Sequence, residues 1–207
     1  MNTISLSWFT RTSTSGDPSD ETSAKDELQL MAAHYDDRLT FQQVEDPNVY
    51  LIAGGPYASI SQTASKHTDK DGNKIVTALR GFSQAGNARM ASASPPEGYL
   101  PPLKSPVISV GRFRIAEDRK VAFDEEWNSI KGILEDFAKP YSLTSGWAES
   151  NSGAATWTEF IMITGWPSVQ RHMDFASTEG FAEYAKKMRG FMEETEIKHY
   201  TGIAYSE

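Results

Sequence analysis

The chain contains no cysteine. This absence excludes disulfide bonds, thiolate zinc sites, iron–sulfur clusters and a cysteine nucleophile. It also lacks an excess of positive charge: 20 Lys and Arg stand against 28 Asp and Glu, and the net charge of −8 argues against binding to nucleic acid phosphates. The longest apolar runs are far shorter than the roughly 20 residues that span a bilayer. We therefore expect a soluble cytoplasmic protein that binds neither nucleic acid nor a membrane.

Cofactor motifs are missing as well. The sequence has no G-x-G-x-x-G segment, no Walker loop and no H-E-x-x-H helix, and its four histidines lie far apart in the chain. The one adjacent glycine pair, Gly54-Gly55, is too short to hold a phosphate group. These absences predict a protein that uses neither a metal ion nor an organic cofactor.

A proline-rich segment divides the sequence. Five of the ten prolines fall within residues 91–106, and such a density of proline permits neither a helix nor a central strand. We interpret 91–106 as an extended linker between an N-terminal half, 1–90, and a C-terminal half, 107–207. Each half has about 100 residues, which suits a small α+β domain.

The C-terminal half has the clearer pattern. Apolar residues at spacings of 4, 3, 4 and 3 from Phe123 to Phe137 predict an amphipathic helix over 118–137. Ser168 and Ser177 are suited to cap two further helices, of which the second runs to about residue 192. Strands are predicted at 107–115, 142–149, 156–166 and 196–205. The resulting order, β-α-β-β-α-β, is that of a ferredoxin-like unit.

The N-terminal half has a weaker version of the same pattern. A strand is predicted at 3–10, a polar loop at 12–23, a helix around 28–35, and a hairpin of strands 39–45 and 49–54 that turns at 46–48. After that the pattern fades: 57–67 suits a helix, and 74–82 suits a helix or a strand. We interpret this half as a degenerate second copy of the unit.

Three segments of the C-terminal half resemble a known superfamily. The strand Phe160-Ile-Met-Ile-Thr-Gly-Trp166, the following Pro167-Ser168-Val169 and the segment Ser177-Thr-Glu-Gly-Phe181 are similar to those of the dimeric α/β-barrel superfamily. That group includes antibiotic-biosynthesis monooxygenases, EthD-like proteins and stress-responsive barrel proteins. The resemblance implies two ferredoxin-like sheets packed face to face around an apolar cavity. We therefore expect an α+β protein whose two copies form one single-chain α/β barrel, either as a monomer or as a homodimer.

The resemblance does not specify the reaction. Plant polyketide cyclases of the group carry a catalytic Tyr and a His where this chain has Phe175 and Thr178, and haem-degrading members carry a ligand His that is missing from 181–186. Trp166 resembles an active-site Trp of the quinone-forming monooxygenases.

His199 is the strongest candidate for a general base. It shares a predicted strand face with Ile197 and Thr201, so a titratable ring lies in a largely apolar row. A core histidine with satisfied hydrogen bonds explains this position equally well. His172, on the short helix after Trp166, is the second candidate, and Tyr200 points to the opposite side of the strand from His199.

Further candidates come from charge and from aromatic residues. Arg112 lies on an apolar strand face, and Glu159 is its expected partner, either in a structural ion pair or in a site that stabilises an oxyanion. Aromatic side chains suit the wall of a cavity for a planar ligand, although each also suits plain core packing. The candidates for substrate binding are Trp8, Trp147, Trp157, Trp166 and Phe175.

Together these features predict a cofactor-free enzyme of secondary metabolism. Its expected substrate is a hydrophobic, polyketide-like or aromatic small molecule, and the expected reaction is an acid–base cyclisation or isomerisation. A cofactor-independent monooxygenase of an electron-rich aromatic substrate is the first alternative. A non-catalytic barrel protein that binds a small molecule or acts in a stress response is the second.

Overall fold

A computed structural model describes residues 2–12, 38–57, 82–149 and 156–203. Within these residues the chain forms two compact units, one of residues 1–89 with 201–207 and the other of residues 90–200. The helix predicted at 28–35 and most of the segments 12–23, 57–67 and 74–82 lie outside the described residues. Each unit is considered separately below.

The 90–200 unit contains a four-stranded antiparallel core. Its strands are β5 (Val107–Ala116), β6 (Leu143–Trp147), β7 (Trp157–Trp166) and β8 (Met192–Gly202), whose last residues join the other unit. They lie side by side in the order β8-β5-β7-β6, and β7 pairs in antiparallel fashion with both β5 and β6. The predicted strands 107–115, 142–149 and 156–166 are therefore confirmed, while β8 begins four residues before the predicted residue 196.

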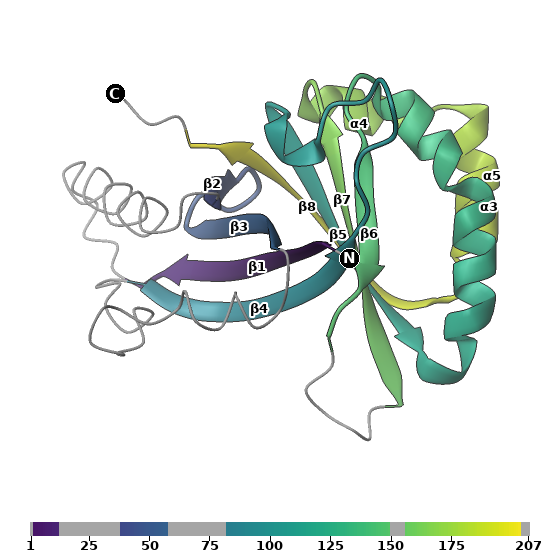
Figure 1. Ribbon diagram of the computed structural model, residues 1–207, viewed down its shortest axis with the longest axis horizontal. Coiled ribbons are helices and arrows are strands. Elements are labelled where there is room, and N and C mark those ends of the chain that lie inside the picture. The colour runs from purple at the N-terminus through teal and green to yellow at the C-terminus, as the bar shows by residue number, and fades with distance from the viewer. Residues whose placement is uncertain (1, 13–37, 58–81, 150–155, 204–207) are drawn as a thin grey trace. The chain divides into compact units, whose positions relative to one another are not determined.

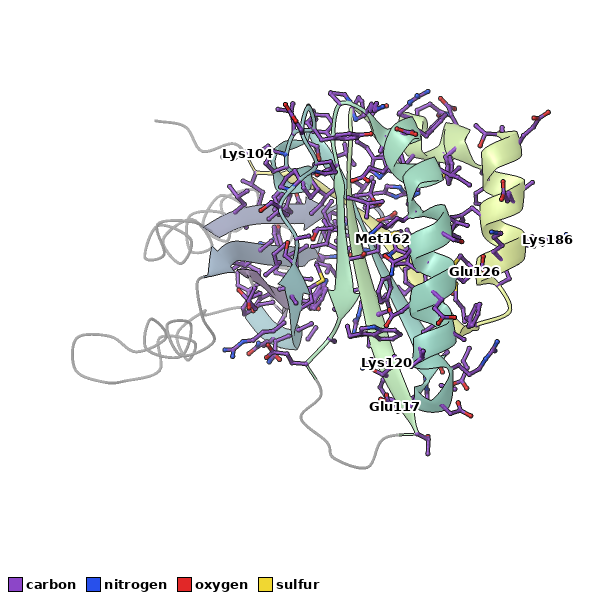
Figure 2. The ribbon with its side chains drawn as sticks, turned by 45° about the vertical axis from the view of Figure 1, so that its right-hand side comes forward. Lys104, Glu117, Lys120, Glu126, Met162 and Lys186 are labelled. Carbon is purple, nitrogen blue, oxygen red and sulfur yellow. The ribbon has the colours of Figure 1, made fainter. Side chains whose placement is uncertain are left out.

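Three helices cover one face of this unit (Figure 1). They are α3 (Lys120–Ala138), α4 (Val169–Phe175) and α5 (Glu179–Met188). The predicted apolar stripe of α3 faces the sheet, and Met162 of β7 lies between the sheet and this helix (Figure 2). The core cluster consists of Val107, Phe113, Ile115, Phe123, Trp127, Ile130, Leu134, Ala138, Phe160, Met162, Trp166, Phe175 and Met188.

Two predicted helix boundaries were partly wrong. Ser168 caps α4 as expected, since its hydroxyl accepts from the Arg171 N–H at 3.1 Å. Thr178, and not Ser177, caps α5, because it is the Thr178 hydroxyl that accepts from the Phe181 N–H at 3.0 Å. The same helix ends at Met188, before the predicted residue 192, and a turn through Gly190 leads into β8.

The N-terminal unit has the same strand order as the 90–200 unit. It contains β1 (Asn2–Arg11), β2 (Arg38–Gln43), β3 (Val49–Tyr57) and most of β4 (Phe82–Ser92), in the order β4-β1-β3-β2. In both units the first strand thus lies between the fourth and the third. The predicted hairpin is confirmed, because β2 pairs with β3 and the Asp46 carboxylate accepts from the Asn48 N–H in the turn.

Strand β4 was not predicted. Its sequence, FSQAGNARMAS, has no β-branched residue and only one aromatic residue, so neither propensity nor alternation indicates a strand. The α+β class and the ferredoxin-like strand order are confirmed, and the fourth strand of the degenerate copy is an addition to the prediction. The closure of the two copies into one barrel, and the division at 91–106 into separate domains, stay predictions.

Candidate active site

The structure sorts the candidate residues of the sequence into separate places. Trp166, His172, Phe175 and His199 lie together on the helix-covered side of the 90–200 unit. Arg112 and Trp157 line a cleft formed by β5, β7 and β8. The remaining candidates are Trp147, which packs beside α3, Tyr200 on the opposite face of β8 from His199, and Trp8 in the N-terminal unit.

The two candidate histidines form a pair. Nδ1 of His172, on α4, lies 2.7 Å from Nε2 of His199, on β8. Their rings meet edge to face, with centroids 4.9 Å apart. His199 is only 7% exposed, whereas His172 is partly exposed. Two imidazoles at this distance share one hydrogen bond, so the pair can hold and release a proton as one acid–base group.

Trp166 supports the pair from the end of β7. Its indole stacks on the His172 ring, with centroids 4.5 Å apart and an angle of 16° between the planes. The indole N–H donates to the hydroxyl of Ser109 at 2.9 Å, and both side chains are almost completely buried. Because the indole N–H is satisfied and the ring is enclosed, Trp166 provides a fixed surface against which the imidazole lies.

Phe175 packs beside this group as part of the core. It is 2% exposed and contacts Phe137 and Tyr184, with ring centroids 5.2 Å and 6.0 Å away. Arg171 packs on Phe137, with its guanidinium carbon 3.7 Å from the ring centroid. Phe175 is therefore part of the packed core, and its expected role in substrate binding stays a prediction.

Arg112 has the partner that the sequence suggested. Its guanidinium reaches one Glu159 oxygen through Nε and Nη2, each at 2.8 Å, and it lies 3.6 Å from Glu196 on β8. Arg114, two residues along β5, stacks on Trp157 and pairs with Glu194 at 2.9 Å. These residues line a cleft of about 660 Å³ whose charged groups are paired with one another.

The other aromatic candidates have structural contacts. The Trp147 indole donates to the Asp124 carboxylate at 2.9 Å, and its ring packs against Phe160 with centroids 5.1 Å apart. Trp8 is 6% exposed in β1, and Tyr200 is 3% exposed in β8.

Ser109 is the site residue that the sequence analysis missed. It is a small polar residue in the middle of an apolar strand, and this contrast was the available signal.

Among the described residues, no group of three or more His, Asp or Glu side chains is arranged to hold a metal ion. No helix in the described part of the chain is long and apolar enough to cross a membrane.

Comparison with known proteins gives matches in structure and none in sequence. No protein-family model matches the chain, and no curated protein matches it. An anthrone oxidase-like protein superposes with a TM-score of 0.65 at 11% identity, over 99% of this chain and 92% of its own. An uncharacterized ferredoxin-fold protein from Listeria monocytogenes 4b F2365, related to antibiotic biosynthesis monooxygenases, gives 0.51 at 12% identity, with coverages of 99% and 97%.

A third match has a different kind of role. It is described as a major regulator of staphylococcal pathogenesis, and it superposes with a TM-score of 0.57 at 10% identity, over 98% of this chain and all of its own. Identities this low show the fold alone, and one fold serves many functions. The matches confirm the ferredoxin-like fold that the resemblance implied.

Proposed function

We propose that the protein is an enzyme whose acid–base group is the His172–His199 pair. The observation that supports this most directly is the 2.7 Å contact between the two imidazoles, one of them buried and the other stacked on Trp166. A positioned imidazole that titrates near neutral pH is the commonest general base in enzymes. The fold relationship to an anthrone oxidase-like protein and to a monooxygenase-related protein supports a hydrophobic aromatic or polyketide-like substrate.

The first step proposed is removal of a proton from an acidic carbon of the substrate. The electron pair of the C–H bond stays on the substrate as a resonance-stabilised carbanion, and the proton moves to the histidine pair. Return of the proton to another atom gives isomerisation. Attack of the carbanion on an internal carbonyl forms a C–C bond and breaks the C=O π bond, and the resulting alkoxide takes the proton back from the histidine pair, which gives cyclisation. Both routes need only the acid–base group, without a bound cofactor.

A cofactor-independent monooxygenase is the second candidate, and the two monooxygenase-type structural matches favour it. Here the same carbanion supplies electrons to O₂. For an anthrone, one O₂ is consumed, the reduced ring carbon becomes a carbonyl, and water is released, so that anthrone and O₂ give anthraquinone and H₂O. The histidine pair has the same role in both candidates, because each begins with loss of the proton.

Anthrone in deuterated buffer tests the proposal in two stages. Without oxygen, the protein should accelerate deuterium exchange at the acidic ring carbon, and His172→Ala should lower this rate by roughly 10²–10⁴-fold. With oxygen present, O₂ uptake coupled to quinone formation identifies the monooxygenase, and exchange without uptake identifies the isomerase or cyclase. Saturable binding of anthrone with neither reaction would favour the non-catalytic binding protein and contradict the proposal.

A further inference from the structure

Arg171 attaches the short helix α4 to the end of α3. Its guanidinium carbon lies 3.7 Å from the centroid of the Phe137 ring, and its Nη2 donates to the Phe137 carbonyl oxygen at 3.1 Å. Phe137 belongs to the last turn of α3, where the backbone carbonyls have no partner within the helix. One side chain of α4 therefore holds both the ring and the backbone of the same α3 residue.

An ion pair does not explain where the guanidinium lies. Among the described residues no carboxylate pairs with Arg171, and Asp174, the acidic residue of α4, accepts from the Gln170 amide at 2.8 Å instead. A planar guanidinium suits the two contacts that Arg171 makes, because it stacks on an aromatic face and donates in its own plane. Its positive charge is also favourable at the C-terminus of a helix. A lysine at this position could donate to the carbonyl but could not stack on the ring in this way.

Phe137 also connects α4 to the Trp166 side chain. Its ring centroid lies 5.2 Å from that of Phe175 on α4 and 6.5 Å from that of Trp166 on β7. Arg171 and Phe175 are four residues apart, so they lie on one face of α4, and both contact Phe137. Two contacts with one ring fix the rotation of a helix that has seven residues and a single buried one, Phe175.

The rotation of α4 determines where the His172 imidazole lies. Successive helix residues are about 100° apart around the axis, so His172 points to a different side of α4 from Arg171. On that side it stacks on the Trp166 indole, with centroids 4.5 Å apart, and its Nδ1 lies 2.7 Å from Nε2 of His199. Because these two contacts join α4 to two different strands, a small rotation of the helix changes both of them.

We infer that Arg171 is a positioning residue: by holding Phe137 it sets the rotation of α4 and keeps the His172 imidazole against Trp166 and His199. The sequence analysis did not identify Arg171 as a candidate, because its role depends on a contact between two helices. Its effect on a reaction rests on the proposed function, whereas its effect on the placement of the imidazole does not. Arg171 is exposed, so its replacement leaves the core of the 90–200 unit intact.

Arg119 offers a matched control at the opposite end of α3. Its guanidinium carbon lies 4.5 Å from the centroid of the Phe191 ring, and its Nη1 donates to the carbonyl oxygen of Gly190. Arg119→Gln therefore removes the same kind of contact, a guanidinium that holds one aromatic ring and one backbone carbonyl, at the turn between α5 and β8. A general loosening of the unit should be similar in Arg119→Gln and Arg171→Gln.

Proton NMR of the imidazole C–H groups at pH 9, where free histidine is neutral, measures the placement of His172 without a substrate. Protons of an imidazole stacked on an indole resonate upfield of those of exposed histidines, and the His172 signals are assigned by their loss in His172→Gln. Arg171→Gln should move these signals downfield, Arg171→Lys should move them less, and Arg119→Gln should leave them in place. Unchanged signals in Arg171→Gln, or equal shifts in Arg171→Gln and Arg119→Gln, would overturn the inference.

Anaerobic deuterium exchange of anthrone tests the effect on the proposed reaction. A misplaced catalytic group lowers the rate without weakening substrate binding, so Arg171→Gln should lower kcat for exchange by roughly 10–100-fold with little change in KM. Arg119→Gln should keep the wild-type values. Equal kcat in the two variants, with the His172 signals shifted as expected, would overturn the catalytic part of the inference. If wild type shows no exchange, the proposed function fails, and the NMR result alone decides whether Arg171 places the imidazole.

Discussion

Replacing Tyr184 with Phe should change how the stability of the protein depends on pH. Tyr184 lies on α5, where its ring packs against Trp127, Phe175 and Phe181 with centroids 6.3, 6.0 and 6.4 Å away. Burial raises the pKa of its phenol from 10.0 to about 12. In the unfolded chain the phenol ionises near pH 10, so above that pH the unfolded state loses a proton that the folded state keeps.

The size of the effect follows from the pKa difference. Each pH unit between the two pKa values corresponds to about 1.4 kcal/mol, so ionisation of Tyr184 should lower the free energy of unfolding by about 3 kcal/mol in total, of which about 2 kcal/mol is lost between pH 10 and pH 12. Below pH 9 the phenol is neutral in both the folded and the unfolded state, so it does not change the free energy of unfolding with pH. Tyr184→Phe lacks the ionisable group, so its stability should fall less steeply over the same range.

Urea denaturation of both proteins at pH 8 to 12 measures this difference directly. Tyr99→Phe is the comparison: burial and the 2.9 Å hydrogen bond to Asp136 raise the pKa of the Tyr99 phenol as well, but less than that of Tyr184, so this variant should remove a smaller part of the alkaline slope. Parallel stability curves for wild type and Tyr184→Phe up to pH 12 would refute the reasoning. Ionisation of Tyr184 near pH 10 in the folded protein, followed by ultraviolet absorbance, would refute it as well.

Three further predictions concern packing, charge and composition. Gly165→Ala should lower the free energy of unfolding, measured by urea denaturation, by about 1–3 kcal/mol, because the new Cβ would lie 2.9 Å from the Pro102 Cα. Gly132→Ala is the matched control: it lies in α3 with open space around it, so it should raise the free energy of unfolding by up to about 1 kcal/mol. A double-mutant cycle on Arg112 and Glu159 should give a coupling free energy of no more than about 1 kcal/mol, because the pair is partly exposed, and added salt should weaken it. A larger coupling free energy that does not change with salt would contradict this expectation. Purified protein should contain no stoichiometric transition metal or flavin, and one equivalent of iron in elemental analysis would overturn the cofactor-free interpretation.

Periodicity predicted the elements whose burial pattern is regular. The spacing from Phe123 to Phe137 placed α3 within two residues at its start, because one apolar stripe must face the sheet. Arg112 was predicted on an apolar strand face with Glu159, a charged residue in another apolar strand, as its partner, and their ion pair is present. The predicted cap of α5 missed by one residue because Ser177 and Thr178 both carry a hydroxyl, and only the helix geometry selects between them.

The sequence pattern could not predict that the two histidines form a pair. His172 and His199 were each identified as candidates, but 27 residues separate them, and their contact depends on how α4 docks against β8. Local patterns define the faces of a helix and of a strand separately, and they do not define the rotation of one against the other. The stack of Trp166 on His172 depends in the same way on how α4 docks against β7.

The proline-rich segment has a consequence for self-association. Strand β6 is the last in its order, and the segment that begins at Met90 contacts it and both of its flanks: the Ser92 hydroxyl lies 2.9 Å from that of Thr144 in β6, Met90 bridges Ala148, and Leu100 exchanges backbone hydrogen bonds of 2.9 Å with Pro140 and Ser142. An uncovered outer strand offers its peptide groups as a template on which another copy can add a strand. A fragment starting at residue 107 would lose this cover, so in sedimentation it should aggregate or pair through β6 more strongly than a fragment starting at residue 90, which keeps this edge blocked. We therefore expect the segment predicted as a linker also to limit pairing between copies of the chain at β6.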